Sequence, residues 1–362
     1  MSAPVYAELE TGGGQWKFLL SLTPLLIWGV ASYGFWPLLM VACTVLLALL
    51  ADGFGQKISG RKAGISLEVL SWSLLVALSC PPHIPFFIPG IVMIPVVFLT
   101  RYLYGAKGGH WLHPVALAWV ILSVSWAHFF GDHPYPAGLD TDVITGATPL
   151  QILTRFVGQP GGGGIQMLAG QGYPISGSDQ NLTAFFNNIL APLNISLPKG
   201  YFDLFWGNTP GALGEGSSLI LLILSVFLLG SRTIRWEVPA MGFLSFSLLV
   251  YFFGGVMHQG GLASGDVLFH LFSGGFLFCL FLMAGDPLTT PLTRSGLLVF
   301  GFGFGGLSFV FRLLGPAPGG SAFALLIMNL LSPSIDWFFT SYFRKKSGRL
   351  QKPVLKYDGM GS

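Results

Sequence analysis

The sequence predicts an all-α polytopic membrane protein of about ten transmembrane helices, arranged as two inverted five-helix repeats with a long outside insertion between them. Three observations lead to this fold class. Only 9% of the 362 residues are charged, against ~25% in soluble domains, and the mean hydropathy is +0.68. Long apolar runs recur along the chain and leave one extended polar stretch near its middle. A short motif that begins with arginine and ends in two glycines occurs once in each half.

Ten apolar runs are candidate membrane spans. The first lacks a convincing signal-peptide cleavage site and leads directly into the second, so we expect it to remain in the protein as a helix. Several runs are shorter than the ~20 residues that a perpendicular helix needs, which leaves their ends open. The runs are 18–33, 35–51, 67–80, 87–102 and 113–130 in the first half, and 217–229, 238–256, 267–283, 297–314 and 322–339 in the second.

The runs divide the chain into five segments. These are an N-terminal cytoplasmic tail (1–16), the first five-helix repeat (17–130), the outside insertion (131–216), the second five-helix repeat (217–343) and a basic cytoplasmic tail (344–362). The insertion is rich in Gly, Pro, Asn and Asp and is too long for an ordinary loop, which marks it as the functional segment. The cysteines, Cys43, Cys80 and Cys279, lie far apart in apolar runs, which predicts buried structural thiols.

The distribution of basic residues predicts the orientation. With both termini in the cytoplasm, 15 of the 18 Lys and Arg residues fall in inner segments, and only Arg155, Lys199 and Arg312 fall in outer ones. The positive-inside rule favours this arrangement, in which residues 131–216 face the outside of the cell inner membrane.

The repeated motif supports an inverted repeat. The pattern R-x-L-x-x-A-x-G-G occurs at residues 101–109 and again at residues 312–320. Each copy directly precedes the last span of a five-span half. Because five is odd, the second half must be inverted relative to the first, and inverted repeats commonly place a site or pathway at their interface near the bilayer centre.

The stretch around which the chain is organised reads D-x-x-T-G-A-T over residues 142–148, near the start of the insertion. Thr148 and the residues after it predict a helix start, with Thr at the N-cap, Pro149 at the first helical position and Gln151 closing a capping box. The pattern also resembles the signature at which a flavin transferase joins the phosphate of FMN to a protein threonine.

That resemblance assigns the FMN phosphoester to Thr148. The small neighbours give a transferase access, and the polar ones supply contacts or help to hold a metal–phosphate group during transfer. The two interpretations are compatible, because a phosphate on an N-cap threonine lies against free backbone N–H groups at the positive end of a helix dipole. The residues expected around the attachment point are Asp142, Thr145, Gly146, Ala147, Pro149 and Leu150.

Two glycine-containing stretches are further candidates. Residues 207–217, G-N-T-P-G-A-L-G-E-G-S, precede a span, and such a loop either cradles a phosphate or forms a turn and a helix cap. The stretch H-L-F-S-G-G lies inside the eighth run, where Ser273, Gly274 and Gly275 either allow close helix packing or leave room for a ring system. His270 in the same stretch is more often satisfied by a neighbour than used as a ligand.

Three ionisable residues lie near the ends of the later spans. Asp286 and Arg294 belong to one inner loop, where the simplest interpretation is that they pair. Asp336 lies near the end of the last run, where it is either structural or part of an ion path.

Together these segments resemble one family, which contains the RnfD subunit of the Rnf electron transport complex and its relative, the NqrB subunit of the sodium-pumping NADH:quinone oxidoreductase. The short N-terminal region is more similar to the Rnf subunit. The matching segments cover most of the chain beyond about its first hundred residues and lie at 142–148, 207–218, 270–275, 286–296 and 319–336.

The resemblance implies a ten-span membrane subunit with covalent FMN. It also implies that the subunit works in a complex with other membrane and peripheral subunits, and that a flavin transferase attaches the FMN. The complex would move electrons between ferredoxin and NAD and couple this transfer to Na⁺ or H⁺ transport. We expect membrane lipid around the subunit and no nucleic-acid partner.

One stretch departs from the family pattern. Relatives carry G-x-N-x-x-N-P-A before the fifth span, near a second, non-covalent flavin such as riboflavin, whereas His110 and His113 occupy the asparagine positions here. The two histidines either face a bound ring or a proton path, or they are ordinary interfacial residues beside Trp111.

Three functions are compatible with these residues. The leading one is a subunit of a redox-driven ion translocase of the ferredoxin:NAD oxidoreductase type. The second keeps the flavin but delivers electrons to another acceptor in a divergent complex. The third is a membrane transporter without a redox role, because inverted repeats are common in transporters. Thr148 separates the third from the others, since a transporter does not need a flavin-attachment motif.

Overall fold

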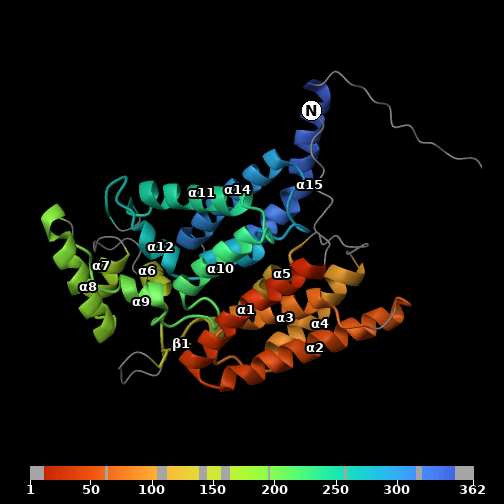
Figure 1. Ribbon diagram of the computed structural model, residues 1–362, viewed down its shortest axis with the longest axis horizontal. Helices are drawn as coiled ribbons and strands as arrows, with labels where there is room; N and C mark the ends of the chain where they lie inside the picture. The colour runs from red at the N-terminus through yellow and green to blue at the C-terminus, as the bar shows by residue number, and fades with distance from the viewer. Residues whose placement is uncertain are drawn as a thin grey trace, which may run out of the picture.

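The structure, a computed structural model, describes residues 12–61, 64–103, 112–137, 145–155, 164–194, 196–256, 259–314 and 320–346. These residues are mostly helical and include one two-stranded sheet. In Figure 1 the helices α1 to α5 of the N-terminal half lie on one side of the molecule and α10 to α15 of the C-terminal half lie on the other. The short helices α6 to α9 of the insertion lie together at one end.

The N-terminal half follows the apolar runs. Prolines stand at or next to the first position of α2 and α5, where the missing N–H and the fixed φ angle suit a helix start. The elements are α1 (Gly12–Tyr33), α2 (Trp36–Ile58), α3 (Leu67–Ser79), α4 (Ile88–Val97), the π-helix η1 (Phe98–Leu103), α5 (Pro114–Ser125) and the 3₁₀-helix η2 (Ala127–Phe130).

In the C-terminal half, side chains cap the starts of α10 and α12. The Ser217 hydroxyl accepts a hydrogen bond from the N–H of Ile220, and the Asp266 carboxylate accepts one from the N–H of Phe269. The elements are α10 (Ser218–Gly230), α11 (Glu237–Phe253), α12 (Val267–Phe272), α13 (Phe276–Phe278), the π-helix η5 (Cys279–Met283), α14 (Arg294–Leu314) and α15 (Ser321–Lys346).

The eighth apolar run differs from its prediction. A continuous span was expected over residues 267–283, but α12 ends at Phe272 and the helix resumes at Phe276. The backbone at Gly274 has a φ of +70°, which a right-handed helix does not accommodate. The small residues therefore break the helix here as well as allowing close packing.

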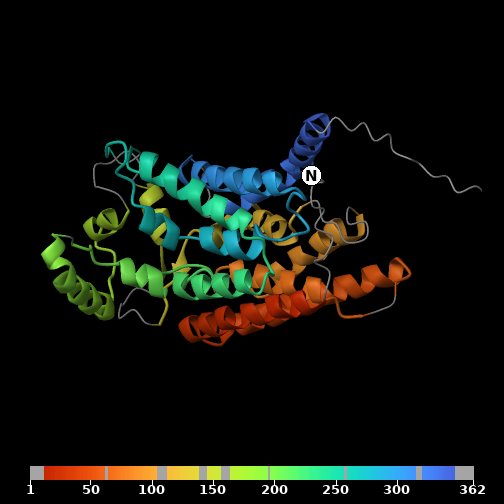
Figure 2. The same ribbon diagram turned by 45° about the horizontal axis from the view of Figure 1, so that its top comes forward.

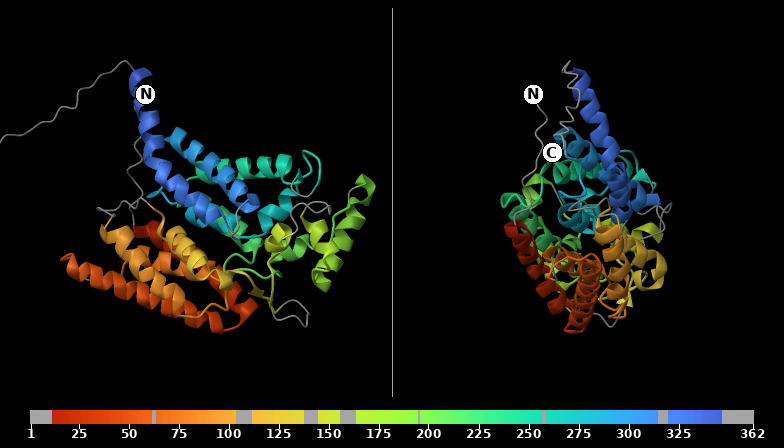
Figure 3. Two further views of the ribbon diagram at one scale, coloured as in Figure 1. Left: turned by 180° about the vertical axis from the view of Figure 1, so that it is seen from behind. Right: turned by 90° about the vertical axis from the view of Figure 1, so that its right-hand side faces the viewer.

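The two halves share one hydrophobic core, which contains residues from both. Within the halves, α2 packs against α3 and α4, and α11 packs against α14, which in turn packs against α15. Between them, α1 contacts α10 and α5 contacts α15. Figure 2 shows the first half below the second, and Figure 3 shows the far end of α15 projecting past the other helices.

The outward faces of the helices are apolar. On α2, Leu46, Leu50 and Phe54 are about 60% exposed along one face, whereas Thr44 and Ala48 are buried on the other. Such a surface suits lipid rather than water. Within the described residues, three helices are long and apolar enough to cross a membrane, namely Trp36–Ile58, Arg294–Leu313 and Ser321–Tyr342. The chain is a multi-pass membrane protein.

The insertion folds as a small unit beside the second half. Its own core contains Leu153 of α6, Leu204 of α9 and Phe269 of α12. The Asp266 carboxylate also accepts hydrogen bonds from the N–H of Ile165 and the hydroxyl of Tyr201, which attaches the insertion to the start of α12. Its elements are β1 (His133–Pro134), β2 (Thr145–Gly146), α6 (Pro149–Arg155), α7 (Ile165–Gly170), α8 (Gly177–Leu190), the 3₁₀-helix η3 (Ala191–Leu193) and α9 (Tyr201–Trp206).

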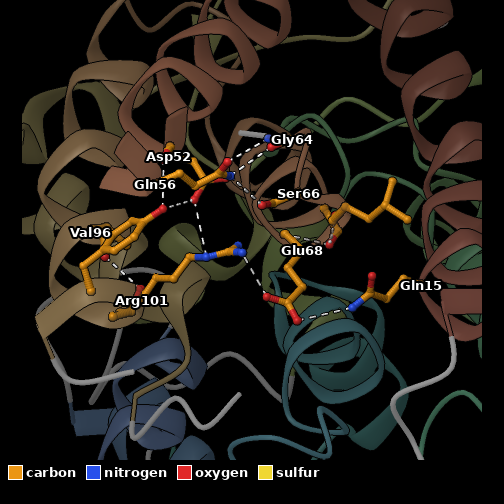
Figure 4. A network of polar contacts seen from close by, with 12 residues as sticks. Gln15, Asp52, Gln56, Gly64, Ser66, Glu68, Val96 and Arg101 are labelled. Atoms are coloured by element: carbon orange, nitrogen blue, oxygen red, sulfur yellow. Dashed lines mark hydrogen bonds and ion pairs between the residues drawn. The ribbon is translucent and has the colours of Figure 1, made fainter. Parts of the chain in front are cut away.

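A buried polar network lies in the first half (Figure 4). The Asp52 carboxylate, 1% exposed, accepts hydrogen bonds of 2.7 Å from the Tyr102 hydroxyl and the Gln56 amide, and lies 3.4 Å from Nε of Arg101. Nη1 of Arg101 lies 3.5 Å from the Glu68 carboxylate. Because Asp52 has these partners, its carboxylate can be buried. The helix α2 therefore continues to Ile58, past residue 51, where this span was expected to end.

We predict that Arg101→Met destabilises the protein, because it leaves the Asp52 carboxylate buried without its cation. Breaking a buried ion pair costs about 3–5 kcal/mol, and the two remaining hydrogen bonds should keep the loss near the lower limit. The control is Lys57→Met, which removes an exposed cation from the last turn of α2, the helix that carries Asp52, and should cost about 0–1 kcal/mol. Thermal unfolding of the purified variants measures the difference. Equal losses would contradict the assignment.

Candidate functional site

Thr148 begins α6 in the way its sequence predicts. The Gln151 backbone N–H donates to the Thr148 hydroxyl over 3.3 Å, and the Thr148 N–H donates to the Gln151 side-chain oxygen over 2.8 Å. This reciprocal pair is the expected capping box, so the predicted helix start is confirmed. The Gln151 amide also donates to the carbonyl of Phe130 over 2.6 Å, which fixes the start of α6 to η2.

A pocket beside Thr148 brings together three stretches that the sequence singled out. The start of α6 contributes Thr148, Pro149 and Leu150, the loop before α10 contributes residues 209–212 and 215–216, and the break after α12 contributes residues 273–275. The remaining lining residues are Ser79, Trp119, Phe130, His133 and Phe272.

The pocket is small. Its cavity volume is about 50 Å³, against at least ~300 Å³ for a typical small-molecule pocket. At ~10–15 Å³ for each water, it has room for a few waters or one small polar group. A large cofactor attached at Thr148 would therefore keep its ring system outside this cavity.

Two glycines make the close approach of these stretches possible. A Cβ atom on Gly274 would lie 3.0 Å from Cδ2 of Leu150 and 3.2 Å from Nη2 of Arg312. A Cβ atom on Gly275 would overlap the Glu215 carboxylate. The two glycines thus leave space for α6, Arg312 and Glu215 at the same turn, and the φ of +70° at Gly274 also favours glycine there.

Arg312 is a buried cation directly behind this turn. It is 3% exposed, donates from Nη1 to the carbonyl of His270, and places its guanidinium 5.1 Å from the centre of the Phe246 ring. Its Nη2 atom has no hydrogen-bond partner among the residues that the structure describes. Buried donors are rarely left unpaired, so Nη2 is available to an acceptor that these residues do not supply.

Glu215 lies on the pocket side of the same turn. Burial raises the pKa of its carboxyl from 4.5 to about 7, and the charge of Arg312 partly opposes this rise. The side chain keeps some exposed surface because it lines the pocket. Within the described ranges, its carboxylate makes neither a hydrogen bond nor a close ion pair. Glu215 is therefore the acidic residue of this pocket, and burial favours its neutral form.

His133 enters the pocket from β1, which pairs with β2 so that His133 lies opposite Gly146. Its ring is buried and lies 6.1 Å, centre to centre, from that of His83. Burial, and to a smaller extent His83, lowers the pKa of His133 to about 4, so the ring is neutral at pH 7. Its Nδ1 atom is buried without a hydrogen-bond partner among the described residues.

The other predicted site residues are placed as follows. Gly146 and Ala147 are half-buried and lead from β2 to Thr148. The backbone of Thr145 lies in β2. Asp142 and His110 lie outside the described residues.

His113 is apart from the pocket. It is the N-cap residue of α5, is 2% exposed, and places Nε2 3.8 Å from the Asp286 carboxylate. Arg294, which we expected beside Asp286, lies 3.7 Å from the Glu237 carboxylate. Asp336 accepts hydrogen bonds from the N–H groups of Leu292 and Thr293, which favours the structural interpretation of this residue.

The chemical roles of three residues do not follow from the sequence. Glu215 is the acidic residue of the stretch 207–217, but that stretch was noted for its glycines. Arg312 was noted as the start of a repeat and counted among the outer basic residues. His133 stands alone in the insertion, where no pattern marks it.

We predict that Gly274→Ala destabilises the protein more than Gly172→Ala. Both glycines have a φ of +70°, where an alanine costs about 1–2 kcal/mol. At Gly274 the added carbon also meets Leu150 and Arg312, and overpacking adds about 1–3 kcal/mol. At Gly172 it meets no atom within 4 Å. Unfolding measurements on both variants test this, and equal losses would show that the turn is not tightly packed.

Comparison with known proteins supports the family resemblance drawn from the sequence. A model of the NQR2, RnfD, RnfE family matches residues 2–344. The D-type subunit of the proton-translocating ferredoxin:NAD(+) oxidoreductase complex of Clostridium ljungdahlii is 27% identical over 325 residues, which cover 90% of this chain and 88% of that protein. The D-type subunit of the ion-translocating oxidoreductase complex of Stutzerimonas stutzeri is 31% identical over 326 residues, with 88% and 87% covered.

A third relative comes from Acetobacterium woodii. It is the D-type subunit of a Na(+)-translocating ferredoxin:NAD(+) oxidoreductase complex, and it is 25% identical over 345 residues, with 93% of this chain and 92% of that protein covered. The family match extends over nearly the whole chain, and the stretches that line the Thr148 pocket all lie within it. The chain therefore belongs to the NQR2, RnfD, RnfE family.

Proposed function

We propose that this chain is the membrane subunit of an Rnf-type ion-translocating electron-transfer complex, and that it carries FMN as a phosphoester on Thr148. The observation that carries the proposal is the pocket in which the Thr148 motif meets the two other stretches that resemble the family. The relatives are named as subunits of proton- or Na⁺-translocating complexes that act between ferredoxin and NAD(+). By analogy, this subunit works between ferredoxin and NAD partners.

The residues around Thr148 fit an attached phosphate. The Thr148 hydroxyl is half-buried at the pocket wall, next to a cavity with room for one small polar group. Nη2 of Arg312 is a buried donor without a partner among the described residues, and it lies behind Gly274, beside Leu150. A guanidinium in that position favours negative charge in the pocket. The fit thus rests on a hydroxyl, a cavity of suitable size and a nearby cation.

FMN, when bound, supplies a group that accepts and gives up electrons. The chain's own residues would fix its attachment end and shape its surroundings. Thr148 holds the phosphate, Arg312 contributes positive charge, and the apolar walls made by Leu150 and Phe272 limit the access of water. Because buried charges are screened less than exposed ones, these fixed groups would set the potential at the pocket.

The finer topology also belongs to this proposal. It consists of ten spans in two inverted repeats, with both termini in the cytoplasm and residues 131–216 outside the cell inner membrane. Helices or broken helices occur at the position of every candidate span, and the halves contact each other through α1 with α10 and through α5 with α15. These pairs are the first and last helices of each proposed repeat, as a two-fold relation requires.

Two other functions are distinguished by experiment. A flavin-bearing subunit that delivers electrons to another acceptor would have the same Thr148 chemistry but different co-purifying proteins. A transporter without a redox role would carry no flavin. The second, non-covalent flavin stays a prediction, and the site expected for it includes His113, which lies beside Asp286.

We predict that Thr148→Ala abolishes covalent flavin, because the phosphoester needs the hydroxyl oxygen. The native protein should give a fluorescent band after denaturing electrophoresis, and the variant should give none. The matched control is Thr154→Ala, which removes another hydroxyl from α6, one that donates to the carbonyl of Gln151. That variant should keep the band. A band of native strength in Thr148→Ala would reject the attachment site.

We predict that a cysteine at position 178 reacts with an impermeant reagent from outside the cell, whereas a cysteine at position 347 does not. Ser178 is exposed at the start of α8, in the proposed outside insertion. The background should carry Cys43→Ser, because Cys43 is only half-buried whereas Cys80 and Cys279 are buried. The reverse labelling pattern would overturn the orientation.

A further inference from the structure

Glu215 is a half-buried acid that lines the pocket beside Thr148. It enters from the loop before α10, and its carboxylate lies against Gly275 at the break after α12. The loop is held in place by backbone hydrogen bonds from Leu213 to the carbonyl of Cys80 and from Gly214 to the carbonyl of Leu78. The position of Glu215 is therefore fixed by both halves of the protein.

This acid has an unusual environment. Partial burial of a carboxylate without hydrogen bonds disfavours its charged form, and the described residues supply no hydrogen bond to Glu215. What they supply is the charge of Arg312, whose Nη2 atom lies beside the neighbouring Gly274. The carboxyl group is thus balanced between its neutral form, which burial favours, and its charged form, which Arg312 favours.

We propose that Glu215 is a proton-binding site coupled to the redox state of the flavin on Thr148. This inference rests on the proposed function and deepens it. The flavin ring would lie outside the small cavity, but its attachment to Thr148 would keep it next to the pocket that Glu215 lines, so an added electron on the ring favours the neutral carboxyl group. Glu215 then takes one proton from water as the flavin gains its first electron, and releases it when that electron passes to the next carrier. The ferredoxin side supplies the electron, and the net charge of the flavin and the pocket together is unchanged by this pair of steps.

The other groups around Glu215 do not account for such a titration near neutral pH. Arg312 stays protonated, and His133 in the same pocket is neutral because burial lowers its pKa to about 4. The remaining titratable groups that interact with Glu215 are Tyr33, Cys80 and Cys279, whose ordinary pKa values lie above 8. The pKa of Glu215, about 7, is the one that falls in the physiological range.

The first test is a redox titration of the Thr148-bound flavin in the purified protein between about pH 5 and pH 9. One proton taken up with one electron changes the potential by about 59 mV for each tenfold change in proton concentration. Proton uptake by the flavin itself is common to all variants, so the comparison isolates Glu215. We expect an added slope near pH 7 that Glu215→Gln loses. The control Glu237→Gln, which changes a buried glutamate next to Arg294, should keep it.

The second test needs no flavin and compares Thr148→Ala with Thr148→Ala/Glu215→Gln. The folded-state pKa of Glu215 is raised, so its stabilising effect is complete below about pH 4.5 and is lost as the pH rises through about 7. The melting temperature of Thr148→Ala should therefore fall between pH 5 and pH 8, and the double variant should fall less. Equal declines would show that Glu215 does not titrate in this range and would overturn the proposal.

The outcomes separate the proposed function from the redox link. A native protein without covalent flavin overturns the proposed function, and with it the redox link. Covalent flavin with the same pH dependence in Glu215→Gln overturns the redox link alone. If Glu215→Gln does not fold, Glu215→Asp takes its place, because it keeps a carboxyl group but holds it on a shorter side chain. The extra slope should then move to another pH, and a slope at an unchanged pH would reject Glu215 as its source.

Discussion

The site depends on the break between α12 and α13. Inside a membrane protein, an interrupted helix leaves backbone groups unpaired, and it is tolerated only where protein or a cavity covers it. Here Gly274 and Gly275 form the break, and a side chain on either would meet Leu150, Arg312 or Glu215. The start of α6, the loop before α10 and the last third of the chain therefore meet at one turn. Thr148 gains its surroundings from this meeting rather than from the insertion alone.

The two arginines that begin the repeated motif differ in the partners that they have inside the protein. Arg101 has close carboxylate partners in Asp52 and Glu68, and the Asp52 carboxylate is further satisfied by Tyr102. That network is complete and suits a structural role. Arg312 leaves Nη2 without a partner in the described part of the chain, and Glu215 lies against the next glycine of the same turn. An incomplete buried network is costly, which is why we assign the second arginine to function.

Much of this arrangement follows from the sequence, and the rest depends on contacts between distant segments. The apolar runs located the helices, and the N-cap of Thr148 followed from local capping chemistry, because both signals lie within a few residues. The extension of α2 past Asp52 did not follow, since Arg101 and Tyr102 come from another helix. Glu215 carried no signal either, because its importance arises from Gly275 and Arg312, far along the chain.

The central claim is that Thr148 bears FMN through its side-chain oxygen. Mass spectrometry of the peptide that contains Thr148, from protein purified out of its native membrane, tests this most directly. We expect the peptide to carry the added mass of FMN joined through its phosphate, with fragmentation placing that mass on Thr148 rather than on Thr145 or Thr154. An unmodified peptide, or flavin on another residue, would contradict the claim.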